Sequence, residues 1–136
     1  MTSARSPQPS DRLDTAGQSH WFDLAVHDLA DAMSFYEGLF GWSYRQMDQS
    51  PIADYVMIEA GGRLIGGLRR ADSASGPKGD SAILYFTVEN LDASARRAKE
   101  LGAELIGAKV ELGSLRGAYQ WFRDRDGRVM GIWAAS

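Results

Sequence analysis

The fold is decided by residues 22–42, which read FDLAVHDLADAMSFYEGLFGW. Apolar residues alternate with polar or small ones up to Val26, which predicts a half-buried strand. Asp28 is a good helix N-cap, and apolar residues then recur at helical spacing as far as Gly41, a typical helix end. The stretch therefore predicts a strand followed by an amphipathic helix.

Three further strands are expected after this helix. Residues 42–47 look extended, and residues 54–60 alternate between apolar and other side chains. Gly61-Gly62 predicts a hairpin turn, and residues 63–68 return as a strand that two glycines interrupt. Together with the opening strand and helix, these segments form a unit of the type βαβββ.

A polar segment separates this unit from a second one. Residues 69–80 read RRADSASGPKGD and are predicted to be a linker. After it, the pattern of strand, helix and three strands is repeated. Its predicted parts are a strand at residues 83–88, a helix from Asn90 to Gly102, an extended segment at 103–106, and strands at 119–123 and 128–133.

Short sequence matches relate the two units. Val26-His27-Asp28-Leu29 matches Val88-Glu89-Asn90-Leu91, and Gly62-Arg63-Leu64-Ile65-Gly66 matches Gly127-Arg128-Val129-Met130-Gly131. We interpret them as an internal duplication, with two similar units of separate origin as the alternative. The predicted organisation is an α+β domain over residues 20–135, made of module 20–68, linker 69–80 and module 81–135, after a disordered tail at residues 1–19.

The composition of the 136-residue chain excludes several kinds of chemistry. The absence of cysteine rules out a disulfide framework, an iron–sulfur cluster, a Cys/His zinc site and a thiol nucleophile. The 15 basic and 18 acidic side chains give a net charge of −3 without a long run of either sign, so nucleic-acid binding is not indicated. The sequence shows neither a signal peptide nor a membrane span, and we expect a soluble cytoplasmic protein.

The two faces of the predicted sheet differ in composition. The helix-facing positions are clean apolar residues such as Leu24, Ile58 and Val88, whereas the opposite positions mix aromatic rings with charges. Such a mixed face is typical of a small-molecule pocket, and a face covered in a dimer is the alternative. The candidate ligand-binding residues are Trp21, Asp23, Tyr55, Met57, Glu59, Tyr85, Trp121 and Trp133.

A set of short motifs occurs in order along residues 20–133. By these motifs and by the duplication, the sequence resembles the vicinal oxygen chelate superfamily, which includes glyoxalase I, extradiol dioxygenases, and the bleomycin- and fosfomycin-resistance proteins. The resemblance implies two βαβββ modules whose curved sheets wrap one cavity, usually in a homodimer. The motifs are Val26-x-Asp28-Leu29, Phe35-Tyr36, Leu39-Phe40-Gly41-Trp42, Ile65-Gly66-Gly67-Leu68, Val88-x-Asn90-Leu91, Leu101-Gly102 and Phe122-Arg123-Asp124-x-Asp126-Gly127.

The resemblance also implies where a catalytic metal would bind. The family's enzymes hold a divalent cation with His, Glu or Gln at four repeated positions, which fall here on Trp21, Gly66, Ile83 and Gly131. None of these four residues has a metal-ligating side chain. His20 is a neighbour of the first position, but a lone imidazole holds a metal poorly. We therefore expect no cofactor and no metal at the family site.

Binding of a small molecule is the function that we expect. Trp21, Tyr55, Tyr85, Trp121 and Trp133 would stack on a planar or partly cationic ligand. Resemblance to the drug-sequestering proteins suggests that the ligand is an aromatic or amphipathic metabolite or antibiotic. Trp42 is expected in the core, and Trp133 could instead anchor a sheet edge or a dimer.

Three alternatives remain at this point. One is a metal-free lyase or isomerase in which Asp23 or Glu59 acts as general acid or base. The second is a lyase or dioxygenase with a divalent metal at a displaced site. The third is a structural partner protein with a dry interface in place of a cavity.

Overall fold

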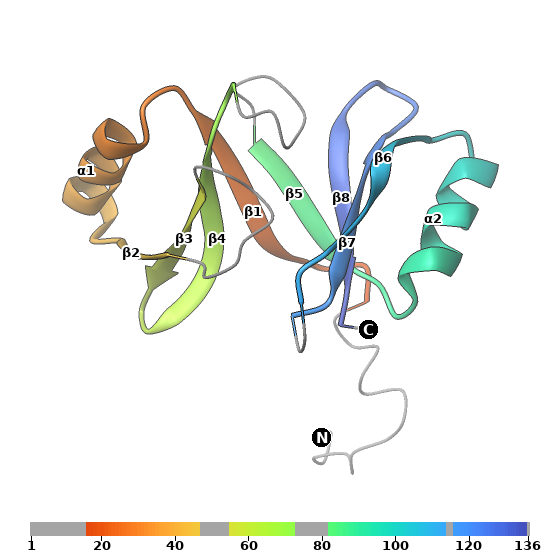
Figure 1. Cartoon of the computed structure of the whole chain (residues 1–136), viewed down its shortest axis with the longest axis horizontal. Helices are drawn as coiled ribbons and strands as arrows, with labels where there is room; N and C mark the ends of the chain where they lie inside the picture. Colours follow the sequence, from red (N-terminus) through yellow and green to blue (C-terminus); the bar gives the residue numbers. More distant parts are fainter. Residues whose placement is uncertain (1–15, 47–54, 73–81, 114–115, 136) are drawn as a thin grey trace, which may run out of the picture.

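The computed structural model describes residues 16–46, 55–72, 82–113 and 116–135. These residues form two helices and eight strands in the order βαβββ followed by βαβββ, which confirms the α+β class (Figure 1). The first module comprises β1 (Ser19–Val26), α1 (Leu29–Phe40), β2 (Ser43–Gln46), β3 (Tyr55–Ala60) and β4 (Arg63–Arg70). The second comprises β5 (Ala82–Thr87), α2 (Leu91–Glu100), β6 (Glu104–Glu111), β7 (Ala118–Arg123) and β8 (Val129–Ala134).

Both helices begin at the capping residues that the sequence predicts. The Asp28 side chain accepts a hydrogen bond of 2.9 Å from the backbone N–H of Asp31, and Asn90 accepts one of 2.8 Å from Ala93. Each bond satisfies one of the N–H groups that a helix start leaves unpaired. Helix α1 ends at Gly41, whose φ of 74° is the left-handed conformation that favours glycine.

All the described strands belong to one mixed, curved sheet in the order β2-β3-β4-β1-β5-β8-β7-β6. Within each module the first strand pairs in parallel with the last, and the modules join through the antiparallel pair β1–β5. In Figure 1, α1 lies beside β2–β4 at one end of the molecule and α2 beside β6–β8 at the other. The inner strands β1 and β5 therefore bring residues of both modules together.

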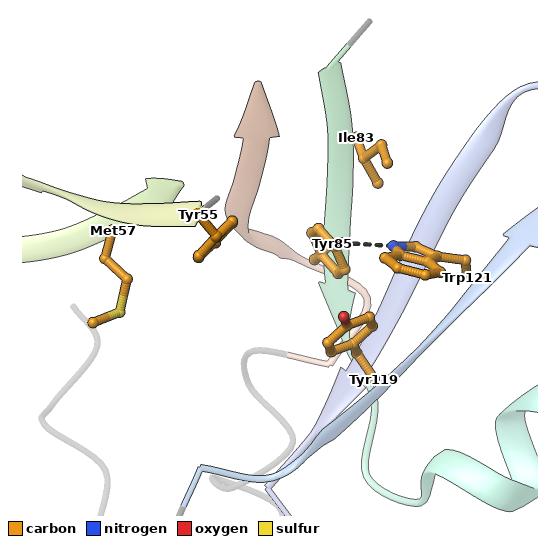
Figure 2. Packing of buried hydrophobic residues seen from close by; sticks show 6 residues of the cluster. All are labelled: Tyr55, Met57, Ile83, Tyr85, Tyr119 and Trp121. Carbon is orange, nitrogen blue, oxygen red and sulfur yellow. Dashed lines mark hydrogen bonds between the residues drawn. The ribbon is translucent and has the colours of Figure 1, made fainter. Parts of the chain in front are cut away.

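The strand alternation separates two faces as expected. On the α1 side, Val56, Ile58 and Leu68 are buried, and Trp42 packs against them as predicted. On the α2 side, Leu91, Ile132 and two alanines form a smaller cluster. The opposite face, which we call the ring-rich face, carries a buried cluster of mainly aromatic residues from both modules (Figure 2): Tyr55, Met57, Ile83, Tyr85, Tyr119 and Trp121.

Three predicted boundaries need correction. Strand β4 continues through Arg69 and Arg70, which the sequence analysis placed in the linker, because the ladder with β3 extends to the pair Tyr55–Arg69. Strand β1 begins at Ser19, and the backbone N–H of Gly17 donates to the carbonyl of Thr87 at 2.8 Å, so the predicted tail is too long. Strand β6 extends past residue 106 because a register irregularity lets its pairing with β7 resume. The rest of the predicted tail (1–15) and most of the linker lie outside the described residues.

Neither described helix has the length and hydropathy that crossing a membrane requires.

Candidate functional site

A buried carboxylate lies at the centre of the ring-rich face. Asp23 on β1 is 2% exposed, and its two oxygens accept hydrogen bonds from three side chains. The Tyr55 hydroxyl donates to Oδ1 at 2.7 Å, and the Tyr85 hydroxyl donates to Oδ2 at 2.8 Å. The Trp21 indole N–H adds a longer contact of 3.3 Å to Oδ1. Burial of the carboxylate is thus compensated by donors from β1, β3 and β5.

The indole N–H groups of two tryptophans donate in turn to the two tyrosine hydroxyls. The Trp121 N–H donates to the Tyr85 hydroxyl at 2.7 Å (Figure 2), and the Trp21 N–H also lies 3.1 Å from the Tyr55 hydroxyl. Each tyrosine therefore accepts from a tryptophan and donates to Asp23. We call these five residues, Trp21, Asp23, Tyr55, Tyr85 and Trp121, the Asp23 network.

The electrostatics of the network follow from its burial. Burial raises the pKa of Asp23 above its ordinary value, although the hydrogen bonds from Tyr55, Tyr85 and Trp21 and the charge of Arg69 oppose the increase. Burial, followed by the charge of Asp23, also raises the pKa values of Tyr55 and Tyr85 well above normal. Both phenols therefore remain protonated at neutral pH and can act as donors.

Two glycines make room for the tyrosine rings. Asp23 pairs with Gly67 across β1–β4, and Tyr85 pairs with Gly131 across β5–β8. A Cβ atom at Gly67 would overlap the Tyr55 hydroxyl, and one at Gly131 would overlap the Tyr85 ring. The tyrosines thus lie directly over strand positions that lack a side chain.

The two glycines lie at or next to the positions where the family resemblance would place metal ligands. Trp21, Ile83 and Gly131 lie on the ring-rich side, as expected. Gly66 does not, because it pairs with Phe22 of the α1-side cluster; its neighbour Gly67 takes the corresponding place. Among the described residues, no three His, Asp or Glu side chains come together as a metal-binding group. The donor set at these positions does not fit a divalent cation.

A cavity of about 570 Å³ opens beside the Asp23 network. Of the predicted ligand-binding residues, six line it: Trp21, Asp23, Tyr55, Met57, Tyr85 and Trp133. The other two, Trp121 and Glu59, are not among the lining residues. Trp121 donates a hydrogen bond to the lining residue Tyr85, and Glu59 forms an ion pair of 3.4 Å with the lining residue Arg45. Such a volume matches those of known small-molecule sites.

Trp133 and His20 form one edge of the cavity. Their rings lie 5.0 Å apart, and the Trp133 N–H donates to the carbonyl of Arg116 at 3.0 Å. Nδ1 of His20 lies 2.6 Å from the Thr87 hydroxyl, and burial lowers the pKa of this histidine. Trp133 thus fixes the segment that carries Arg116, in addition to presenting a ring to the cavity.

Several lining residues are not among those that the sequence pattern predicted. Tyr119 lies two residues before Trp121 on β7 and therefore on the same face, so the period-two pattern could have identified it. Arg63 is the first residue of β4 and Arg116 lies shortly before β7, and neither stands in a sequence pattern that distinguishes it from a solvent-exposed charge. The other missed lining residues are His20, Arg45, Gln46, Leu64 and Leu112.

The fold is that of a known class of protein. The sequence model of the Glyoxalase/Bleomycin resistance protein/Dioxygenase superfamily matches residues 18–130, and the chain belongs to this superfamily.

The sequence identity to individual relatives is low. The chain is 29% identical to the anthracycline biosynthesis protein DnrV of Streptomyces peucetius, over 86% of this chain and 46% of DnrV. It is 23% identical to the putative glyoxylase CFP32 of Mycobacterium tuberculosis, over 88% of this chain and 45% of that protein. The chain therefore spans about half the length of these relatives.

The crystal structure of the Mn(II)-bound glyoxalase from Novosphingobium aromaticivorans is similar in fold. It superposes with a TM-score of 0.64 at 17% identity, over 89% of this chain and 40% of that one.

Proposed function

We propose that this protein binds a small aromatic or amphipathic molecule in the cavity beside the Asp23 network, without a metal ion. The observation that carries the proposal is the lining itself. Trp21, Tyr55, Tyr85, Tyr119 and Trp133 present aromatic surface from both modules to one space of about 570 Å³. Affinity would come from burial of the ligand and from stacking on these rings.

The residues at the family's metal-ligand positions support the proposed metal independence. Divalent cations require several carboxylate or imidazole donors directed at one point. Here Gly67 and Gly131 are covered by Tyr55 and Tyr85, and a longer side chain at either position would collide with those rings. In this proposal the Asp23 network crosslinks the strands where a metal ion would otherwise do so, because its hydrogen bonds connect β1, β3 and β5.

The name of one relative supports the proposed class of ligand. DnrV is named for anthracycline biosynthesis, and anthracyclines are planar polycyclic aromatic compounds. A ring system of this kind is the chemistry that the aromatic lining suits best.

A thermal-shift experiment tests the proposal. Chelator-treated protein is heated with a panel of naphthalene, anthraquinone and anthracycline compounds, together with aliphatic compounds of similar size. We expect planar aromatics to raise Tm and Trp21→Ala to reduce the shift. Phe35→Ala serves as the control, because Phe35 is 60% exposed on α1 and does not line the cavity. If the aromatics produce no larger shift than the aliphatics, the proposal fails.

A second candidate is a metal-free lyase or isomerase, and the raised pKa of Asp23 favours it. Asp23 lines the cavity, whereas Glu59 does not and is paired with Arg45, so Asp23 is the acid or base of this candidate. Mass spectrometry of a bound compound would detect turnover, which Asp23→Asn should abolish and Glu59→Gln should leave. Elemental analysis of the untreated protein separates both candidates from a displaced-metal enzyme.

We further propose that the chain forms a homodimer, as the family resemblance implies. Sedimentation equilibrium tests this directly. A species of twice the chain mass of 14.9 kDa supports it, and a monomer at high micromolar concentration contradicts it.

A further inference from the structure

The ring-rich face of the sheet carries a buried cation, Arg69, for which the stacking of an aromatic ligand gives no role. Arg69 lies directly opposite Tyr55 on β3 and Ala25 on β1, so its side chain starts from the ring-rich face. The residue is 2% exposed. Within the part of the chain that the structure describes, its Nε and Nη1 atoms are buried without a hydrogen-bond partner.

Asp23 does not compensate for these two nitrogens. The charge of Arg69 reaches Asp23 and opposes the rise of its pKa. However, the Asp23 oxygens already accept from Tyr55, Tyr85 and Trp21, and neither Nε nor Nη1 of Arg69 donates to them. A buried guanidinium whose Nε–H and Nη1–H groups lack acceptors is unfavourable, and an acceptor placed beside these two nitrogens would remove that cost.

A second unpaired group lies within electrostatic reach of this cation. Tyr119 is 4% exposed and lines the cavity, and its buried hydroxyl lacks a partner among the described residues. The charges of Asp23 and Arg69 both act on the pKa of Tyr119, the first raising it and the second lowering it, while burial raises it most. Its ring is fixed by an edge-on contact with Tyr85 at 5.6 Å.

Arg69 is not itself among the described lining residues, but most of the charged side chains that do line the cavity are also basic. Arg45, Arg63 and Arg116 line the cavity, against one acidic residue, Asp23, whose acceptors are in use. Glu59 partly offsets Arg45. Within the described lining, basic side chains thus outnumber acidic ones although the whole chain has a net charge of −3, and an excess of positive charge favours anions.

We propose that Tyr119 in the cavity lining and Arg69, buried on the same face of the sheet, form an anion-binding subsite, which receives a carboxylate of an aromatic ligand. This rests on the proposed function and narrows it, because it selects acidic ring compounds over neutral ones. Arg69 supplies charged N–H donors, and Tyr119 supplies a neutral O–H donor. The cavity arginines attract the acid, and the rings hold the rest of the molecule.

Two probes of nearly equal shape test the subsite. Naphthalene-2-carboxylate and the neutral naphthalene-2-carboxamide are titrated calorimetrically into the chelator-treated full chain at neutral pH. We expect the carboxylate to bind at least tenfold more tightly. Arg69→Met and Tyr119→Phe should each reduce that preference several-fold while they leave carboxamide binding in place.

Controls separate the subsite from general charge and from misfolding. Arg97→Met removes an exposed cation on α2 that pairs with Glu100, and it should keep the full preference. Tyr119→Phe removes one oxygen atom, so it remains informative if Arg69→Met does not fold. Loss of the preference in an Arg63→Gln, Arg116→Gln double variant, with no loss in Tyr119→Phe or Arg69→Met, would assign the anion to the cavity entrance and overturn the proposal.

The outcomes also distinguish the two proposals. Equal binding of both probes to the unmodified protein overturns the anion subsite alone, because rings are still bound. Binding of neither probe overturns both the subsite and the aromatic-binding function.

Discussion

The Tyr85 hydroxyl on β5 donates a hydrogen bond of 2.8 Å to Oδ2 of Asp23 on β1. The two residues occupy the same place in the two modules, since each stands three positions before the valine of the repeated motif, Val26 or Val88. The duplicated position has therefore become an acceptor in one module and a donor in the other. This bond joins the modules where they meet, and it closes one wall of the cavity.

Removal of this bond should destabilise the protein. Tyr85→Phe leaves Oδ2 of Asp23 short of a donor and the Trp121 N–H without its acceptor, so we expect a loss of about 1–3 kcal/mol in the free energy of unfolding. Tyr44→Phe is the matched control, because its hydroxyl makes a single bond of 3.2 Å to the Met33 carbonyl. Urea unfolding measures both. Equal losses in the two variants would contradict the central role of the Asp23 network.

The glycines under the tyrosine rings should not tolerate a methyl group. Gly131→Ala places Cβ into the Tyr85 ring, and we expect a destabilisation of about 1–3 kcal/mol from overpacking. Gly38→Ala within α1 has open space around the new atom and should stabilise the helix by about 0.5–1 kcal/mol. Chemical denaturation of the pair gives the comparison, and a neutral Gly131→Ala would show that Tyr85 can move aside.

The raised pKa of Asp23 predicts a pH dependence of stability. The folded state binds this proton more tightly than the unfolded state, so the contribution of Asp23 is complete below its unfolded value and is lost as the pH rises through the folded value. The difference in unfolding free energy between the unmodified protein and Asp23→Asn should therefore fall from about pH 4 towards pH 7.

Asp124 provides a control of opposite sign. Backbone N–H groups, that of Arg128 first, lower the pKa of this exposed carboxyl. The corresponding difference for Asp124→Asn should rise with pH over the acidic range. A flat or rising difference for Asp23→Asn would contradict the predicted burial of a titrating carboxylate.

Local patterns were sufficient to predict much of the fold. The caps Asp28 and Asn90 placed both helix starts, because their side chains act within one turn. Strand alternation placed Trp21, Tyr55 and Tyr85 on one face, because successive side chains point to opposite sides of a sheet. The sequence was sufficient to predict that position 131 has no metal-ligating side chain. That Gly131 leaves space for the Tyr85 ring could not be predicted, because it depends on the β5–β8 register.

The parts that could not be predicted depend on long-range register. Arg69 stands in a polar, arginine-containing run that is typical of a linker, and only its pairing with Tyr55 places it in the interior. Likewise, the hydrogen bonds of Asp23 join strands whose relative offset is fixed by the β1–β5 junction. Spacing along one chain carries no information about that offset.

The most direct test of the account is the affinity of one aromatic ligand with and without metal. The tightest binder from the thermal-shift panel is titrated calorimetrically into metal-stripped protein and into protein supplied with Mn²⁺ or Zn²⁺. We predict about one site per chain and dissociation constants that agree within about twofold. Binding that appears only after metal is restored would contradict the account.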